Sequence, residues 1–269
     1  MKADEKTFLD TLWRYYDTSA RLLPWRTPEA DGRLDPYKIL VSEIMLQQTQ
    51  VERVIPKYLA FLHRFPTIDA LQSSELSDVI ALWSGLGYNR RAKYLHDISK
   101  KLRSHKQPWT VQGLTALKGI GQNTAAAICV YSYNQPHVFI ETNIRTIYLH
   151  HFFLGKKGVS DAQIIELVER TLDRVHPREF YWALMDYGTH LKKQGIRNNN
   201  HSQHYKKQLR FEGSKRQVRG MVMRLLAEHG SLSPEKIQRE INDSRLGQVL
   251  ADLEREEMIA STNNSIHIA

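Results

Sequence analysis

Cysteine, long apolar runs and strand patterns are all scarce in this chain of 269 residues. Its one cysteine, Cys129, excludes an internal disulfide and any site built from several thiolates. No apolar run approaches the roughly 20 residues that a membrane-spanning helix needs, and the first residues lack the apolar core of a signal peptide. We therefore expect a cytoplasmic protein, nucleoid-associated if bacterial, with no membrane partner, no cofactor and no metal.

Helical periodicity dominates residues 5–190. Apolar residues recur at helical spacing, for example over 76–83 and 164–172, and most prolines stand at the starts of these segments or just past their ends. Hydrophobic residues make up 41% of the chain, which is enough for real cores, and its length suits two or three helical units. We expect an all-α protein in which Cys129, inside an apolar run, is a buried structural thiol.

Positive charge is concentrated in one stretch. Residues 188–224 contain ten Lys or Arg residues against one acid, Glu212, so this stretch carries the same net charge of +9 as the whole chain. A local basic block on an otherwise balanced protein is typical of polyanion binding. A solvated basic linker is the alternative, and the polar residues 191–214 do indicate a connection rather than an element.

The pattern changes after residue 214. Residues 218–226 predict an amphipathic helix, residues 233–241 a second one and residues 246–253 a third, and residues 258–268 predict a hairpin around an Asn-Asn turn. Three helices followed by a hairpin indicate a winged-helix-like, DNA-binding domain over residues 215–269. A helical dimerisation module is the alternative.

A glycine-rich turn joins an apolar segment to a small-residue helix at residues 117–125. Gly119 and Gly121 permit positive φ, and Ile120 between them can point inward. The turn would leave the backbone N–H groups of Gly121 and Gln122 free at the start of the next helix, which is a phosphate-binding arrangement. A simple tight turn is the alternative.

Two acids have settings suited to chemistry. Glu141 precedes a helix expected over 144–153, whose N-terminus favours a carboxylate. Glu43 stands among aliphatic residues on a helix opened by Pro36, and desolvation should raise its pKa towards that of a general acid. Together they supply a proton donor for a leaving base and an anion for an oxocarbenium-like sugar. An ordinary helix-start acid and an exposed helix Glu are the alternatives.

Groups that could enter a stack of bases stand near the first acid. Gln47, Gln48 and Thr49 end the Glu43 helix, and a glycine-flanked turn carries Tyr88 at its tip. A Gln or Tyr side chain can fill the gap left by an extruded nucleotide. Core packing is the usual fate of an aromatic side chain, but the glycines and the Arg90-Arg91 pair favour an exposed loop.

These segments strongly resemble the MutY-type adenine DNA glycosylases of the helix-hairpin-helix (HhH-GPD) superfamily. The resemblance covers roughly residues 8–190, and its most specific part is the Ser-Glu-x-Met-Leu-Gln-Gln-Thr block that begins at Ser42. It implies a two-lobed all-α fold that holds an extruded base in a cleft. It also implies that Glu43 is the general acid, that Gln48 and Tyr88 probe the stack, and that an acid at 141 lies beside the sugar.

The chain departs from this family at four points. Glu141 replaces an aspartate, and Asn123 stands where bifunctional relatives carry a Schiff-base lysine, so strand cleavage is not expected. The cysteines of an iron–sulfur cluster are absent, and in their place we expect Lys192, Lys193 and Arg197 to contact phosphates. The domain that reads 8-oxoguanine is replaced by the winged-helix candidate.

We thus expect a glycosylase domain over 1–190, a basic linker over 191–214 and the winged-helix-like domain over 215–269. The expected activity is monofunctional base excision by a monomer acting on double-stranded DNA, with adenine opposite 8-oxoguanine or guanine as the substrate. Two alternatives stay open. One is the excision of another mismatched or modified base, for example a hypermodified base of phage DNA. The other is an inactive DNA-binding regulator.

Overall fold

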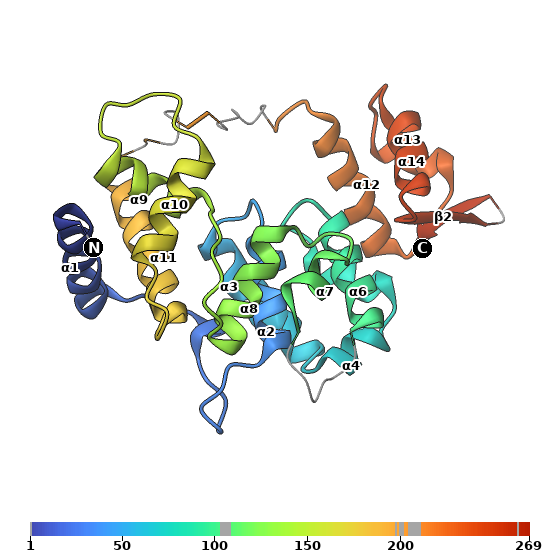
Figure 1. Ribbon diagram of the computed structural model, residues 1–269. Coiled ribbons are helices and arrows are strands. Elements are labelled where there is room, and N and C mark those ends of the chain that lie inside the picture. Colours follow the sequence, from blue (N-terminus) through green and yellow to red (C-terminus); the bar gives the residue numbers. More distant parts are fainter. Residues whose placement is uncertain (1, 103–108, 197, 199–201, 204–210, 263) are drawn as a thin grey trace. The chain divides into compact units, whose positions relative to one another are not determined.

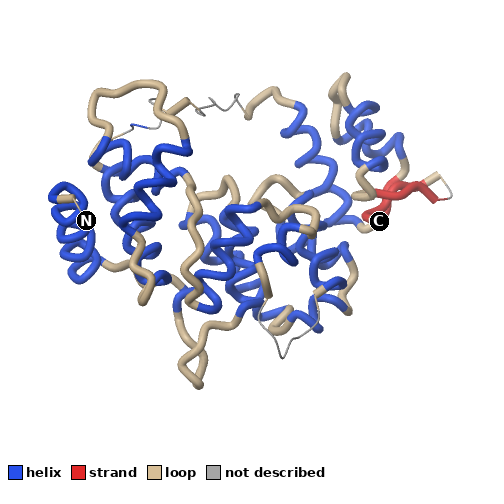
Figure 2. The backbone as a smooth tube through the Cα atoms, in the orientation of Figure 1, coloured by secondary structure: helices blue, strands red, loops and turns tan. Residues whose placement is uncertain are grey.

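The computed structural model describes residues 2–102, 109–196, 198, 202–203, 211–262 and 264–269, and it divides them between two compact units. The first unit contains residues 1–39, 108–116 and 120–207, and the second contains residues 40–107, 117–119 and 208–269. Helices dominate both units, as the sequence predicted, and the strands that Figure 2 draws in red lie near the C-terminus.

The named elements of the first unit are all helices among its described residues. They are α1 (Ala3–Ser19), the 3₁₀ turn η1 (Pro24–Arg26), the start of α2 (Pro36–Leu46), α7 (Val111–Thr115), α8 (Gln122–Tyr133), α9 (Thr142–Phe152), α10 (Asp161–Thr171) and α11 (Pro177–Lys193). Helix α11 packs against α1, α8 and α9, and α10 packs on α9, an arrangement that Figure 1 shows for α9, α10 and α11. The buried rings of Tyr148, Phe180 and Tyr181 fill its core.

A buried carboxylate joins distant segments of the first unit. Asp186 on α11 is 1% exposed and accepts hydrogen bonds from Arg21 and Arg26, whose guanidinium groups lie 2.6–2.9 Å from its oxygens. Arg26 belongs to the Leu-Pro-Trp-Arg segment, about 160 residues earlier in the chain. A buried charge is tolerated only when it is paired and hydrogen-bonded, so this network fixes α11 against the N-terminal segment.

The second unit contains the rest of α2, α3 (Val51–Arg64), α4 (Ile68–Gln72), α5 (Leu76–Trp83), α6 (Arg90–Lys101) and the C-terminal elements. Helices α4 and α5 pack against α6, and α3 packs against α5 around the buried side chains of Tyr58, Phe61 and Trp83. Helix α12 (Lys215–His229) also packs against α5, so the C-terminal segment belongs to the same compact unit as residues 40–107.

The C-terminal elements follow the expected order. After α12 come β1 (Ser231–Leu232), α13 (Pro234–Glu240), α14 (Leu246–Arg255), β2 (Ile259–Thr262) and β3 (Ser265–Ile268), in an antiparallel sheet ordered β1-β3-β2. The three helices and the hairpin are confirmed, whereas the two-residue strand β1 was not predicted because it is too short to show alternation. The assignment of this module as a winged helix that binds DNA stays a prediction.

Three local predictions can be compared directly with the structure. Pro36 opens α2, which ends at Leu46 as expected. Cys129 is fully buried and burial raises the pKa of its thiol to about 11, so it is an inert structural thiol as predicted. Helix α11 continues to Lys193, three residues into the segment interpreted as a connection.

Candidate functional site

Glu43 lies on α2 between fully buried neighbours. Ser42 is 0% exposed, and Ile44 and Met45 are at most 1% exposed, while Glu43 itself is half-buried. The helix is apolar because residues 39–45, apart from Glu43, are buried on all sides of it. Its role as the general acid stays a prediction.

Glu141 caps the N-terminus of α9. Its carboxylate Oε1 accepts hydrogen bonds from the backbone N–H of Asn143 at 2.5 Å and of Ile144 at 3.1 Å. Glutamate is not a preferred N-cap residue, but its extra methylene lets the side chain curl back onto these two donors. Burial raises the pKa of Glu141, and the Lys192 charge, the two N–H donors and the Arg145 charge oppose this rise.

The glycine-rich turn uses its two glycines differently. Gly119 has φ +99°, and a Cβ there would stand 2.5 Å from the Tyr94 ring, so only glycine fits. Gly121 is the N-cap of α8 with φ −86°, an ordinary extended conformation, which corrects the expectation that it uses positive φ. Ile120 between them is buried as predicted, and Gly121 and Gln122 are exposed at the helix start.

Asn123 supports the backbone before Glu141. Its Nδ2 donates to the carbonyl oxygen of Ile140 at 2.8 Å, which places the first turn of α8 against the irregular segment that leads into α9. The residue that stands in place of a lysine in bifunctional relatives is therefore engaged structurally in this chain.

Arg91 joins two loops of the second unit, a role that the sequence did not reveal. Its side chain is 7% exposed, and its guanidinium donates to the carbonyl oxygens of Ile44 and Met45 at 3.0 and 2.9 Å and to the Thr49 hydroxyl at 2.9 Å. Three more acceptors are the carbonyl oxygens of Gln47, Leu86 and Gly87. Burial lowers the pKa of Arg91 to about 10, so it stays charged at neutral pH.

The two loops held by Arg91 carry Gln48 and Tyr88. Both residues are exposed, and both have left-handed backbone conformations, with φ of +55° and +50°. Such conformations cost of order 1 kcal/mol for residues other than glycine, and they persist only where the surroundings fix them. The loop of Gln48 is further tied to the hairpin, because Gln47 Nε2 lies 3.4 Å from the carbonyl oxygen of Gly119.

The C-terminal elements contact the Tyr88 loop directly. Arg216 on α12 lies with its guanidinium carbon 5.8 Å from the centre of the Tyr88 ring. Glu256, just after α14, bridges Arg90 on α6 and Arg219 on α12, with oxygen–nitrogen distances of 3.0 Å to Arg90 Nε and 2.5 Å to Arg219 Nη2. The C-terminal elements are thus held on the loop that carries the predicted stack-probing residue.

The basic residues after α11 differ in how they are placed. Lys192 Nζ donates to Asn143 Oδ1 at 2.6 Å, and its side chain is half-buried, whereas Lys193 is exposed. Arg197, the third predicted phosphate contact, lies outside the described residues. DNA binding by these three residues stays a prediction.

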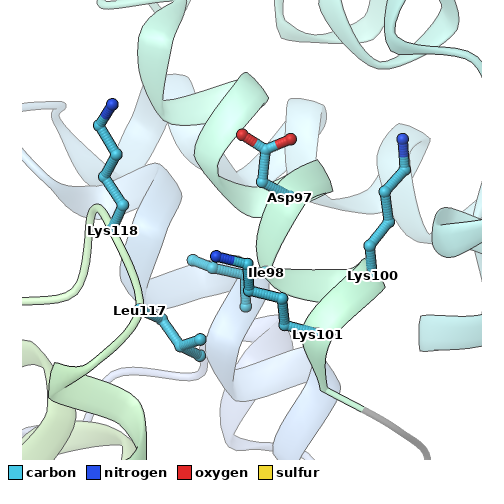
Figure 3. A pocket seen from close by; sticks show the side chains of 6 residues that line it. All are labelled: Asp97, Ile98, Lys100, Lys101, Leu117 and Lys118. Atoms are coloured by element: carbon cyan, nitrogen blue, oxygen red, sulfur yellow. The ribbon is translucent and has the colours of Figure 1, made fainter.

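A shallow pocket of the second unit lies beside the hairpin. It is lined by Asp97, Ile98, Lys100 and Lys101 of α6 and by Leu117 and Lys118 of the hairpin (Figure 3). The side chains of Lys100 and Lys118 extend in the same direction in this view. None of the predicted catalytic residues lines this pocket, and its three lysines against one carboxylate give it a positive potential.

Two features are absent from the described residues. No three His, Cys, Asp or Glu side chains within the described ranges are grouped as metal ligands would be. Within the same ranges, no helix has both the length and the apolar character needed to cross a membrane.

Residues 41–174 match the family described as HhH-GPD superfamily base excision DNA repair protein. This part of the chain belongs to the HhH-GPD superfamily. The matched segment contains Glu43, the Arg91 loops, the hairpin with Asn123, and Glu141. The resemblance inferred from the sequence motifs is therefore confirmed at the level of the superfamily.

Three curated relatives of this HhH-GPD chain share the name adenine DNA glycosylase. The adenine DNA glycosylase of Buchnera aphidicola subsp. Baizongia pistaciae is 34% identical over 189 residues, which are 67% of this chain and 52% of the relative. The adenine DNA glycosylase of Mycolicibacterium smegmatis is 35% identical and is covered to 60%, and that of Homo sapiens is 33% identical and is covered to 36%. The chain thus spans about half the length of the curated relatives it matches.

Solved structures confirm the fold of the HhH-GPD chain. A thermostable thymine-DNA glycosylase aligns with a TM-score of 0.58 and 21% identity over 69% of this chain and 86% of that one. A non-covalent endonuclease III–DNA complex aligns with a TM-score of 0.56 and 12% identity over 69% and 85% of the two chains. At these identities the likeness shows the fold alone.

Proposed function

We propose that this protein is a monofunctional DNA glycosylase that extrudes a base from duplex DNA and cleaves its bond to the sugar, leaving an abasic site. The proposed substrate is adenine opposite 8-oxoguanine or guanine. Relatives named adenine DNA glycosylase, at 33–38% identity, support this choice of base.

The observation that carries the proposal is the setting of Glu141. A carboxylate that accepts two N–H hydrogen bonds through Oε1, at the positive end of α9, is a prepared anion whose Oε2 lies outside both bonds. Such an anion stabilises positive charge that develops on a sugar ring.

The remaining residues divide the work in the proposed reaction. The N–H groups at the start of α8 bind a backbone phosphate, and Lys118, four residues before Gln122 in the chain, adds positive charge. Gln48 and Tyr88, held by Arg91, occupy the gap left by the extruded nucleotide. Glu43 protonates the leaving base, and Glu141 stabilises the sugar cation until water captures it.

Release of free base from a panel of duplexes tests this proposal. Alkali reveals abasic sites and mass spectrometry identifies the base released from adenine opposite 8-oxoguanine, adenine opposite guanine, mismatched thymine or uracil, and hypermodified phage DNA. We expect adenine from the first two. Release from modified DNA alone would assign a different substrate, and no release from any duplex would favour a DNA-binding regulator.

A further inference from the structure

Lys192 on α11 and Glu141 at the start of α9 are linked through one asparagine. Lys192 Nζ donates to the side-chain oxygen of Asn143 at 2.6 Å, and the backbone N–H of the same Asn143 donates to Glu141 Oε1 at 2.5 Å. One asparagine thus links an ammonium group on α11 to the carboxylate that caps α9. The two charges interact favourably, since each shifts the other's protonation towards the charged form.

The close approach of the two helices depends on a glycine. A Cβ on Gly188 of α11 would stand 2.7 Å from Asn143 Cβ and 2.9 Å from the Asn143 carbonyl oxygen, distances that real structures do not tolerate. Lys192 follows Gly188 by four residues, so it lies one helical turn further along the same face. The geometry of α11 therefore directs the lysine onto Asn143 rather than into solvent.

Few other charges face Glu141 from the elements packed around it. On α9 itself Arg145 contributes a second positive charge, but its guanidinium is paired with Asp161 of α10 at 2.8 Å. From α8 the neutral amide of Asn123 is bonded to the carbonyl oxygen of Ile140, the residue before Glu141. Among the described residues, Lys192 is therefore the main charge that opposes the desolvation of Glu141.

We propose that Lys192 is a positioning residue of the reaction, whose ammonium group, anchored on Asn143, holds Glu141 as an anion at neutral pH. This inference rests on the proposed function and deepens it, because a buried carboxylate that took up a proton would no longer stabilise a sugar cation. It gives one residue of the basic stretch a task beyond the attraction of phosphates.

The pH dependence has a definite sign. Burial raises the pKa of Glu141, so activity that needs the anion is retained above this raised pKa and lost as the pH falls through it. Removing the Lys192 charge would raise the pKa of Glu141 further. The acid limb of the activity profile would then move to higher pH, while the alkaline limb, on which Glu43 would lose the proton it donates, would keep its midpoint.

Single-turnover base release measured as a function of pH tests this inference. In Lys192→Met we expect the midpoint of the acid limb to rise by about one pH unit, with a loss of about tenfold in rate on the acid side and an unchanged midpoint of the alkaline limb. Lys192→Arg, which keeps the charge, should restore the midpoint. Lys157→Met, a change at an exposed lysine, should match the wild type.

A second readout does not depend on activity. With ¹³C-labelled glutamate carboxyl groups, the Glu141 signal is assigned by its absence in Glu141→Gln and then titrated in the wild type and in Lys192→Met. A higher Glu141 pKa in Lys192→Met supports the inference. An equal Glu141 pKa in both proteins overturns the inference, even if base release is observed. If the wild type releases no base, the proposed function is overturned, and this titration still tests whether Lys192 controls the charge of Glu141.

Discussion

Arg216 Nη1 donates a hydrogen bond of 2.7 Å to the Tyr88 hydroxyl. Tyr88 is the predicted stack-probing residue, and Arg216 belongs to the first helix of the C-terminal elements, 128 residues later. The guanidinium carbon of Arg91 lies 5.7 Å from the centre of the same ring, so two guanidinium groups contact this tyrosine. The C-terminal elements therefore contribute directly to the conformation of a loop in the HhH-GPD domain.

We predict that Arg216→Met lowers the rate of base release about tenfold by freeing the Tyr88 side chain, since one hydrogen bond to a charged donor contributes about 1.5 kcal/mol. The salt dependence of DNA binding should keep its slope, because Arg216 acts on Tyr88. Arg174→Met, which removes an exposed arginine of the first unit, serves as the control. An unchanged rate with a salt slope reduced by about 1 would instead identify Arg216 as a phosphate contact.

Glu256 should fasten the C-terminal elements in a pH-dependent way. Burial tends to raise the pKa of its carboxyl, but hydrogen bonds from Arg219 and Arg90 outweigh this and hold the pKa below the ordinary value. The contribution of Glu256 to the free energy of unfolding is therefore present at pH values above the ordinary pKa and is lost as the pH falls below it.

Urea unfolding of Glu256→Gln measures this contribution. We expect a loss of about 1 kcal/mol at pH 7, because the carboxylate bridges two arginines while remaining partly exposed. The difference from the wild type should shrink below about pH 4.5, the ordinary glutamate value. A difference that stayed constant with pH would show that the charge of Glu256 is not what stabilises this contact.

Substitution of Arg91 should destabilise the protein far more than substitution of Glu256. Arg91→Met leaves carbonyl oxygens of two loops without their donor, and we expect a loss of roughly 3 kcal/mol in the free energy of unfolding. Arg91→Lys should recover only part of this, because an ammonium group lacks the planar fork that reaches both loops. Arg64→Met, at an exposed ion pair with Asp78, should cost less than about 1 kcal/mol. Equal losses at positions 91 and 64 would contradict the clamping role.

Asn123 bears on the type of chemistry. Because this position carries an amide already bonded to Ile140, we predict that the wild type gives no covalent complex with DNA on reduction with borohydride. Asn123→Lys supplies an amine and should give a trapped complex. Trapping by the wild type would mean that another amine forms a Schiff base, and the same reduction of Lys192→Met would show whether it is Lys192.

The local features of this protein could be predicted from its sequence, whereas its long-range contacts could not. Glu141 was expected at a helix N-terminus because the residues after it begin a helical pattern, and Ile120 was expected to be buried because glycines flank it. Both inferences use only neighbours in the chain. The sequence block that begins at Ser42 resembles a known family, and this resemblance gave the correct superfamily.

Arg91 and Lys192 show why the rest was missed. Arg91 follows Arg90 in a polar segment, and this pattern favours an exposed loop. Arg91 is buried instead, because its acceptors at residues 44–49 lie more than 40 positions earlier in the chain. Lys192 looked like one of ten basic residues, and its partner Asn143 is 49 positions away. The packing of α6 brings Arg91 to its acceptors at residues 44–49, and the packing of α11 on α9 separately brings Lys192 to Asn143.

The most direct test of the central claim compares wild type with Glu43→Gln on a duplex containing adenine opposite 8-oxoguanine. Single-turnover base release and the DNA dissociation constant are measured on the same protein samples. We predict that the variant loses at least about 10²-fold in the rate of adenine release while its DNA affinity stays within about threefold of the wild type. Adenine release at the wild-type rate by Glu43→Gln would contradict the account.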